Sequence, residues 1–225
     1  MLIAIADALS PDQVAHARAR LEAADWVDGR VTAGAQSATV KNNLQVPEGS
    51  AVARELGEII LRALGSNEAF VSAALPLRLS APLFNRYDVG QGFGTHVDNA
   101  IRFAGAQRIR TDLSCTLFLT DPGRYDGGEL VIEGANGDQR VKLPAGALVL
   151  YSSTSLHRVE PISKGSRWAS FFWVQSMVAD DARRTLLRDL DRAIMETRAA
   201  LGDHTPAVLR LTATYHNLLR MWAQV

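Results

Sequence analysis

The sequence predicts a mainly β fold with flanking helices, in which a β sandwich or barrel is followed by a C-terminal helical hairpin. Three observations lead to this prediction. From about residue 70 to 176, short runs rich in Val, Leu, Phe and Thr alternate with turn signals, a pattern typical of sandwiches and barrels. Apolar residues recur at helical spacing before Gly65 and again after Met177. A chain of 225 residues buries about 70% of its surface on folding, which is enough for one sizeable core.

The N-terminal region is expected to form a strand over residues 1–8 and then a helix. Ser10 is a favourable N-cap, Pro11 suits the first helical position, and Asp12 falls in the first turn. This helix should end before Trp26. The residues that it would bury are Val14, Ala17 and Leu21.

Residues 27–46 are polar, with short strand-like pieces around Thr39-Val40 and Gln45-Val46. A second helix should run from about Ser50 to Leu64 and stop at Gly65, because glycine is favoured where helices end. Its apolar face would hold Val52, Leu56, Ile59 and Ile60.

The β core should contain several strands separated by turns such as Asp88-Val89-Gly90 and Asp121-Pro122-Gly123. The expected strands are Leu77–Leu83, Leu113–Thr120, Glu129–Glu133, Leu148–Ser152 and Ala169–Val174.

Two helices are expected after the β core. Asp180-Asp181 can cap the first, Gly202 ends it, and Thr205-Pro206 starts the second. The first carries Leu186, Leu187, Leu190 and Ile194, and the second carries Leu209, Leu211, Tyr215, Leu218, Leu219 and Trp222. An apolar face of this size must be buried, either on the chain's own core or against a second copy in a homodimer.

Composition excludes several classes of protein. The 24 basic and 24 acidic residues cancel, which argues against nucleic-acid binding. A single cysteine, Cys115, excludes an internal disulfide and a Cys-rich zinc site, and it fits a reducing compartment such as the cytoplasm. No apolar run approaches the ~20 residues that span a bilayer. The first ten residues lack a basic segment, so we interpret them as a strand rather than a signal peptide.

One group of residues has the composition of an iron site. His96 and Asp98 lie two positions apart, a spacing that puts both side chains on one face of a strand. His157, after the apolar run Leu148–Tyr151, could complete a 2-His-1-carboxylate set. Arg167 follows ten positions later. The residues alone leave open a structural His–Asp hydrogen bond with an unrelated histidine.

Longer motifs around these residues resemble a known family. The stretch Asn85–Asp98 (NRYDVGQGFGTHVD), with Tyr125–Leu130, Pro144–Gly146, His157 and Arg167, resembles prolyl-4-hydroxylase-type dioxygenases. The chain resembles bacterial PKHD-type hydroxylases, the PiuC/YbiX family, even more closely and over nearly its whole length. The segments that carry this second resemblance are Trp26–Gly34, Val40–Asn43, Leu83–Tyr87, Arg110–Ser114 and Tyr215–Arg220.

The resemblance implies a double-stranded β-helix (jelly-roll) dioxygenase that uses Fe(II), 2-oxoglutarate and O2, with L-ascorbate as a candidate further cofactor. By the same resemblance His96, Asp98 and His157 would bind iron, and Arg167 and Tyr87 would hold the distal carboxylate of 2-oxoglutarate. The dioxygenase domain would span residues 1–178, with the jelly-roll core at about 70–176 and the N-terminal helices packed on it. Residues 179–225 would form a C-terminal helical subdomain.

The expected activity is hydroxylation of an unidentified substrate, with decarboxylation of 2-oxoglutarate to succinate and CO2. The substrate would be a small molecule, such as a siderophore-type compound linked to iron uptake, or a peptide side chain. Lys41 and Asn43 could line the substrate entrance, or they could simply build a turn. Two alternatives are a non-catalytic sensor of iron or 2-oxoglutarate and a nucleic-acid demethylase on the same scaffold.

Overall fold

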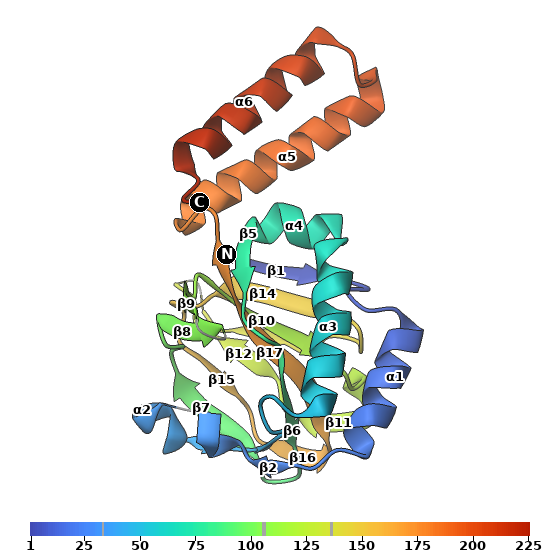
Figure 1. Ribbon diagram of the computed structural model, residues 1–225, viewed down its shortest axis with the longest axis vertical. Helices are drawn as coiled ribbons and strands as arrows, with labels where there is room; N and C mark the ends of the chain where they lie inside the picture. Colours follow the sequence, from blue (N-terminus) through green and yellow to red (C-terminus); the bar gives the residue numbers. More distant parts are fainter. Residues whose placement is uncertain (33, 105–106, 136) are drawn as a thin grey trace.

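Two β sheets pack face to face in the computed structural model, and helices cover the outer face of the larger sheet (Figure 1). The structure describes residues 1–32, 34–104, 107–135 and 137–225. The predicted mainly β architecture, with flanking helices and a C-terminal helical pair, is confirmed.

The larger sheet is antiparallel, in the order β1-β14-β10-β17-β6-β4-β2, and β5 also pairs with β17. Its strands are β1 (Leu2–Ile5), β14 (Leu148–Ser152), β10 (Leu113–Phe118), β17 (Arg167–Ser176), β6 (Leu83–Tyr87), β4 (Leu44–Gln45), β2 (Val27–Asp28) and β5 (Pro76–Leu79). The single strand predicted at Leu77–Leu83 is wrong, because β5 and β6 are separate. The break contains Ser80, whose N–H donates to the Trp173 carbonyl at 2.9 Å and whose hydroxyl accepts from the Trp173 N–H at 3.0 Å.

The smaller sheet has the order β13-β12-β15-β7-β3. Its strands are β13 (Gln139–Val141), β12 (Leu130–Ile132), β15 (His157–Val159), β7 (Gly92–His96) and β3 (Lys41–Asn42). The two-stranded pairs are β11 (Tyr125–Gly127) with β16 (Ile162–Gly165) and β8 (Ile101–Ala104) with β9 (Gln107–Arg110). In the pairing of β15 with β7, His157 lies opposite His96 but Val159 lies opposite Phe93, so β7 carries one extra residue as a bulge.

Alternation along the strands separates two apolar cores. In β14, Leu148 and Leu150 belong to the core that includes the helices, whereas Val149 and Tyr151 belong to the core between the sheets. The site described below lies on the inner side of the sandwich, because its residues occupy the inward-facing positions of both sheets.

The first two long helices begin where the sequence predicts. Ser10 caps α1 (Pro11–Glu22) in a capping box with Gln13, and Ser50 caps α3 (Ala51–Gly65). Figure 1 shows these two helices on the same side of the larger sheet.

Several short elements differ from the prediction. Residues Thr39-Val40 form a turn, and the strand lies two residues later, in β3. The unpredicted helices are η1 (Gly29–Thr32), α2 (Ala35–Ala38), α4 (Glu68–Ala74) and η2 (Pro122–Arg124). Asn67 caps α4, which ends at Leu75 in the left-handed conformation. A helix this short owes its stability to the burial of Phe70, Ala73 and Ala74, which a sequence pattern hardly reveals.

The C-terminal helices form a hairpin that extends away from the sheets (Figure 1). Its helices are α5 (Asp181–Leu201) and α6 (Pro206–Trp222), and the predicted caps Asp180, Gly202 and Thr205 are confirmed. Leu187 is fully buried and packs with Leu75, Val178 and partly buried residues of α6. The prediction that Leu186 is buried is wrong for packing against the chain's own core, since this residue is 58% exposed. Among the helices described, none is long and apolar enough to cross a bilayer.

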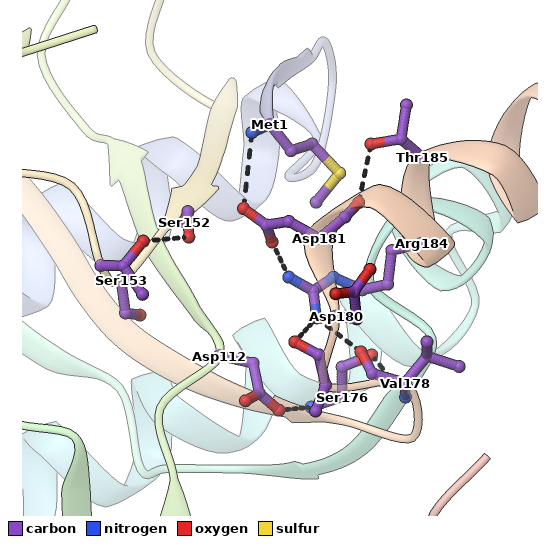
Figure 2. A network of polar contacts seen from close by, with 12 residues as sticks. Met1, Asp112, Ser152, Ser153, Ser176, Val178, Asp180, Asp181, Arg184 and Thr185 are labelled. Carbon is purple, nitrogen blue, oxygen red and sulfur yellow. Dashed lines mark hydrogen bonds and ion pairs between the residues drawn. The ribbon is translucent and has the colours of Figure 1, made fainter. Parts of the chain in front are cut away.

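A polar network joins the start of this hairpin to the core (Figure 2). The buried Arg184 guanidinium donates to the Val178 and Ala179 carbonyls and pairs with Asp181. The Asp181 carboxylate also lies 3.6 Å from the amino group of Met1, the residue that precedes β1. The hairpin is therefore held by directional contacts as well as by apolar packing.

Candidate active site

Three predicted ligands meet between the sheets. His96 ends β7, His157 begins β15, and the two face each other across these neighbouring strands. Asp98 follows β7 by two residues, and its Oδ2 lies 3.8 Å from His157 Nε2. One ligand atom from each of the three residues lies within 4.8 Å of the others, close enough for all three to hold one metal ion.

Backbone carbonyls set the orientation of both imidazoles. His96 Nδ1 is 2.8 Å from the Gly94 carbonyl oxygen, and His157 Nδ1 is 3.1 Å from that of Ser155. A carbonyl oxygen can only accept, so each Nδ1 carries a proton, and in the neutral form of each ring the Nε2 lone pair is left for a metal. Metal-binding histidines are typically oriented in this way, by a hydrogen bond from the ring nitrogen that does not bind the metal. The bulge in β7 contributes directly, because the Gly94 carbonyl lies within it.

Two serines hold the Asp98 carboxylate. The Ser114 hydroxyl, on β10, donates to Asp98 Oδ2 at 2.6 Å, and the Ser153 oxygen lies 2.7 Å from the Ser114 oxygen. Since Ser114 gives its only proton to the carboxylate, Ser153 is the donor in the second bond.

The residues fit Fe(II). Two neutral imidazoles and one carboxylate form the facial set of non-haem iron oxygenases, which leaves coordination positions open. Burial is the main cause that lowers the pKa of His96 to about 4, followed by the neighbouring His157. The His96 imidazole is therefore neutral at pH 7, as a ligand must be. Phe93 stacks on the His96 ring at a centroid distance of 3.6 Å and shields that side.

Arg167 and Tyr87 lie deeper in the same cavity. They face each other across β17 and β6, and each residue is 1% exposed. Among the described residues, the Arg167 Nε has no hydrogen-bond partner and no carboxylate oxygen lies within 4.0 Å of the guanidinium. A buried cation without an anion is unfavourable, so this position suits the carboxylate of a bound acid. Burial raises the pKa of Tyr87, which keeps its hydroxyl protonated and able to donate.

The cavity around these groups opens to solvent, and the space within it, including the solvent at its mouth, is about 740 Å³. Lys41 lines its wall, whereas Asn43 is not among the lining residues and is 3% exposed behind it. Sequence reasoning missed Ser114 and Arg102, which line the cavity together with Trp173. Alternation along β10 could have placed Ser114 on the inner face, but nothing local indicates Arg102.

Comparison with known proteins agrees with this geometry. The model of the 2OG-Fe(II) oxygenase superfamily matches residues 82–175, and that of the PKHD-type hydroxylase C-terminal domain matches residues 181–224. A PKHD-type hydroxylase of Gluconobacter oxydans is 64% identical over 227 residues, with 100% of both chains covered.

Two solved structures share the fold. A Pseudomonas putida prolyl-4-hydroxylase has a TM-score of 0.53 at 20% identity, covering 78% of this chain and 92% of its own. HygX from Streptomyces hygroscopicus, solved with nickel, 2-oxoglutarate and hygromycin B bound, has a TM-score of 0.54 at 16% identity, covering 78% and 82%. These similarities confirm the expected jelly roll. The full-length identity shows more: the chain belongs to the PKHD-type hydroxylase family, dioxygenases that use Fe(II) and 2-oxoglutarate.

Proposed function

We propose that this chain is a hydroxylase in which His96, Asp98 and His157 bind Fe(II) and Arg167 and Tyr87 hold 2-oxoglutarate. One observation carries the proposal: the buried, uncompensated Arg167 shares a cavity with a set of ligands that suits iron. A structural pair of His157 and Asp98 would explain neither the second histidine, His96, beside them nor the buried arginine in the same cavity.

The residues divide the work between binding and orientation. Bound Fe(II), with 2-oxoglutarate and O2, would supply the oxidation: one oxygen atom of O2 would enter succinate as CO2 leaves, and the other would enter the hydroxylated substrate. Arg167 suits the distal carboxylate, because its planar fork can donate two parallel hydrogen bonds. Tyr87 donates a further hydrogen bond to the same group. Phe93 covers His96 and limits water at the site.

We place a small molecule, such as a siderophore-type compound, ahead of a peptide side chain as the substrate. The aromatic side chains of Phe93, Phe171 and Trp173 line the cavity beside the ligands and suit a compact organic molecule. A siderophore-type substrate would link the reaction to iron uptake. We also propose a dioxygenase domain at 1–178 with a helical subdomain at 179–225, and a reducing cytoplasm as the compartment, since Cys115 is a buried free thiol.

The test is an anaerobic titration with Fe(II) and 2-oxoglutarate, followed through the visible charge-transfer band of a keto acid chelated to ferrous iron. We expect the band in the wild type, its loss in Asp98→Ala, and a higher 2-oxoglutarate requirement in Arg167→Ala. Arg140→Ala is the matched control, because Arg140 is exposed on β13. No band in the wild type would refute the proposal.

Succinate release under air separates an enzyme from a sensor. Slow, substrate-independent succinate formation is expected of a hydroxylase without its substrate. A protein that shows the band and forms no succinate would be a binding protein, the first alternative raised by the sequence.

A further inference from the structure

Two cationic side chains on the cavity wall have no anionic partner among the residues that the structure describes. Lys41 lies on β3 and Arg102 on β8, and both line the cavity that holds the proposed iron ligands. Lys41 is only 5% exposed, and its ammonium donates to the Thr32 hydroxyl at 3.0 Å. Within the described ranges, no carboxylate oxygen lies within 4.0 Å of either cation. Asp28, one of the acidic groups nearest Lys41, pairs with Arg30.

Aromatic rings support these cations without neutralising them. The Arg102 guanidinium lies 3.9 Å from the Trp173 ring centroid. The Lys41 ammonium lies 5.3 Å from the centroid of Phe93 and 5.6 Å from that of Phe171. Cation–π contact holds a positive charge in place, but a ring has no net charge to offset it. The indole N–H of Trp173 also has no acceptor among the described residues.

A count of the charges in the proposed site shows that this wall carries an excess of positive charge. The two positive charges of Fe(II) and that of Arg167 balance the dianion of 2-oxoglutarate and the Asp98 carboxylate. Lys41 and Arg102 then leave two positive charges unbalanced beside the substrate space. Unpaired charges in a partly buried cavity are costly until an anion joins them.

The ionisation of the two groups agrees with this picture. Burial is the main cause that lowers the pKa of Lys41 to about 8, and Arg102 adds to it, while Asp98 and Asp28 oppose the shift. Burial also lowers the pKa of Arg102, against the raising effects of Asp98 and Glu48. Both side chains are still charged at pH 7, so two like charges face the cavity together.

We propose that Lys41 and Arg102 together bind a carboxylate of the small-molecule substrate and so select anionic substrates. This inference rests on the proposed function, because it assigns Arg167 and iron to the cosubstrate and leaves this wall to the substrate. The planar Arg102 fork can grip two carboxylate oxygens, while the Lys41 ammonium adds a point charge.

Benzoate and benzamide test the proposal, because they have nearly the same shape and differ in charge. Each is titrated calorimetrically into the full chain loaded with Mn(II), which replaces Fe(II) without turnover, and saturating 2-oxoglutarate. We expect benzoate to bind at least about tenfold more tightly than benzamide, the effect of one hydrogen bond to a charged group. The preference should disappear in Arg102→Gln and in Lys41→Met.

Arg108→Gln is the matched control, since Arg108 is exposed on β9 of the same hairpin and does not line the cavity. It should keep the benzoate preference. Equal affinities for the two probes, no benzoate binding, or a preference that survives in Arg102→Gln would overturn the inference. Benzoate that competes with 2-oxoglutarate would also overturn it, because the cations would then serve the cosubstrate.

The binding of 2-oxoglutarate itself is measured first in every sample. Its absence from the wild type refutes the proposed function, whereas normal 2-oxoglutarate binding without a benzoate preference refutes only the present inference. Normal 2-oxoglutarate binding by the two variants also shows that they are folded.

Discussion

Replacing Ser114 by alanine should weaken metal binding without disturbing the fold. The Ser114 hydroxyl lies behind the carboxylate of Asp98 and donates to its Oδ2 at 2.6 Å. The Ser114 oxygen accepts a hydrogen bond from Ser153, so the Ser114 hydroxyl cannot donate to another acceptor without breaking this chain of hydrogen bonds. In Ser114→Ala the carboxylate loses the contact that fixes its angle toward the two histidines.

The expected magnitude follows from two independent ranges. A hydrogen bond to a charged group contributes about 1.5–3 kcal/mol. Loss of a group that hydrogen-bonds to a metal ligand typically costs about 10–100-fold in metal affinity, which corresponds to about 1.4–2.8 kcal/mol. The two ranges coincide, so we expect the dissociation constant of Fe(II) to rise about 10–100-fold.

The assay is anaerobic Fe(II) titration, repeated with Mn(II) and read by electron paramagnetic resonance. Ser170→Ala is the matched control, because Ser170 is a fully buried serine of the same sheet whose hydroxyl has no hydrogen-bond partner in the described part of the chain. Wild-type affinity in Ser114→Ala, or an equal loss in Ser170→Ala, would refute the idea that Ser114 positions the carboxylate.

Three further predictions follow from features described above or from close backbone contacts. Arg184→Met should lower the unfolding free energy by about 2–4 kcal/mol and the melting temperature by about 5–15 °C, because two carbonyls at the start of α5 lose a charged donor. Arg192→Met, at an exposed position of the same helix, should change the unfolding free energy by less than about 0.5 kcal/mol. Equal melting temperatures of Arg184→Met and Arg192→Met would contradict the stabilising role of Arg184. Benzoate affinity should fall as the pH rises through about 8, since the lowered pKa of Lys41 means that its charge is present below that value and lost above it; a flat profile would argue against Lys41. Gly127→Ala should destabilise the fold by about 2–5 kcal/mol in a denaturant titration, because φ is +75° and a Cβ would lie 2.1 Å from the Pro161 carbonyl oxygen; an unchanged midpoint would exclude this clash.

Local chemistry explains which elements could be predicted. Ser10, Ser50, Asp180 and Thr205 cap their helices as expected, because a cap depends on a few neighbouring residues. The short helix α4 was missed, since its stability comes from residues that only the fold brings to it.

The candidate site likewise contains residues that the local sequence predicts and residues that only the fold brings together. His96 and Asp98 are close in sequence, so their meeting at one site could be predicted, although β7 ends at His96 and Asp98 lies outside the strand on which the prediction placed it. Ser114 and Arg102 reach the site from other strands, and the register of those strands depends on the whole sandwich. Leu186 was misplaced because helical spacing alone allows a wider apolar face than α5 buries within one chain.

The bulge in β7 has a consequence for how the segment can vary. Phe93 and His96 are held opposite Val159 and His157 only because an extra residue lies between them. Deleting that residue would restore regular pairing and turn His96 toward the opposite face of the sheet. During evolution or library design, this stretch can therefore exchange side chains more readily than it can change its length.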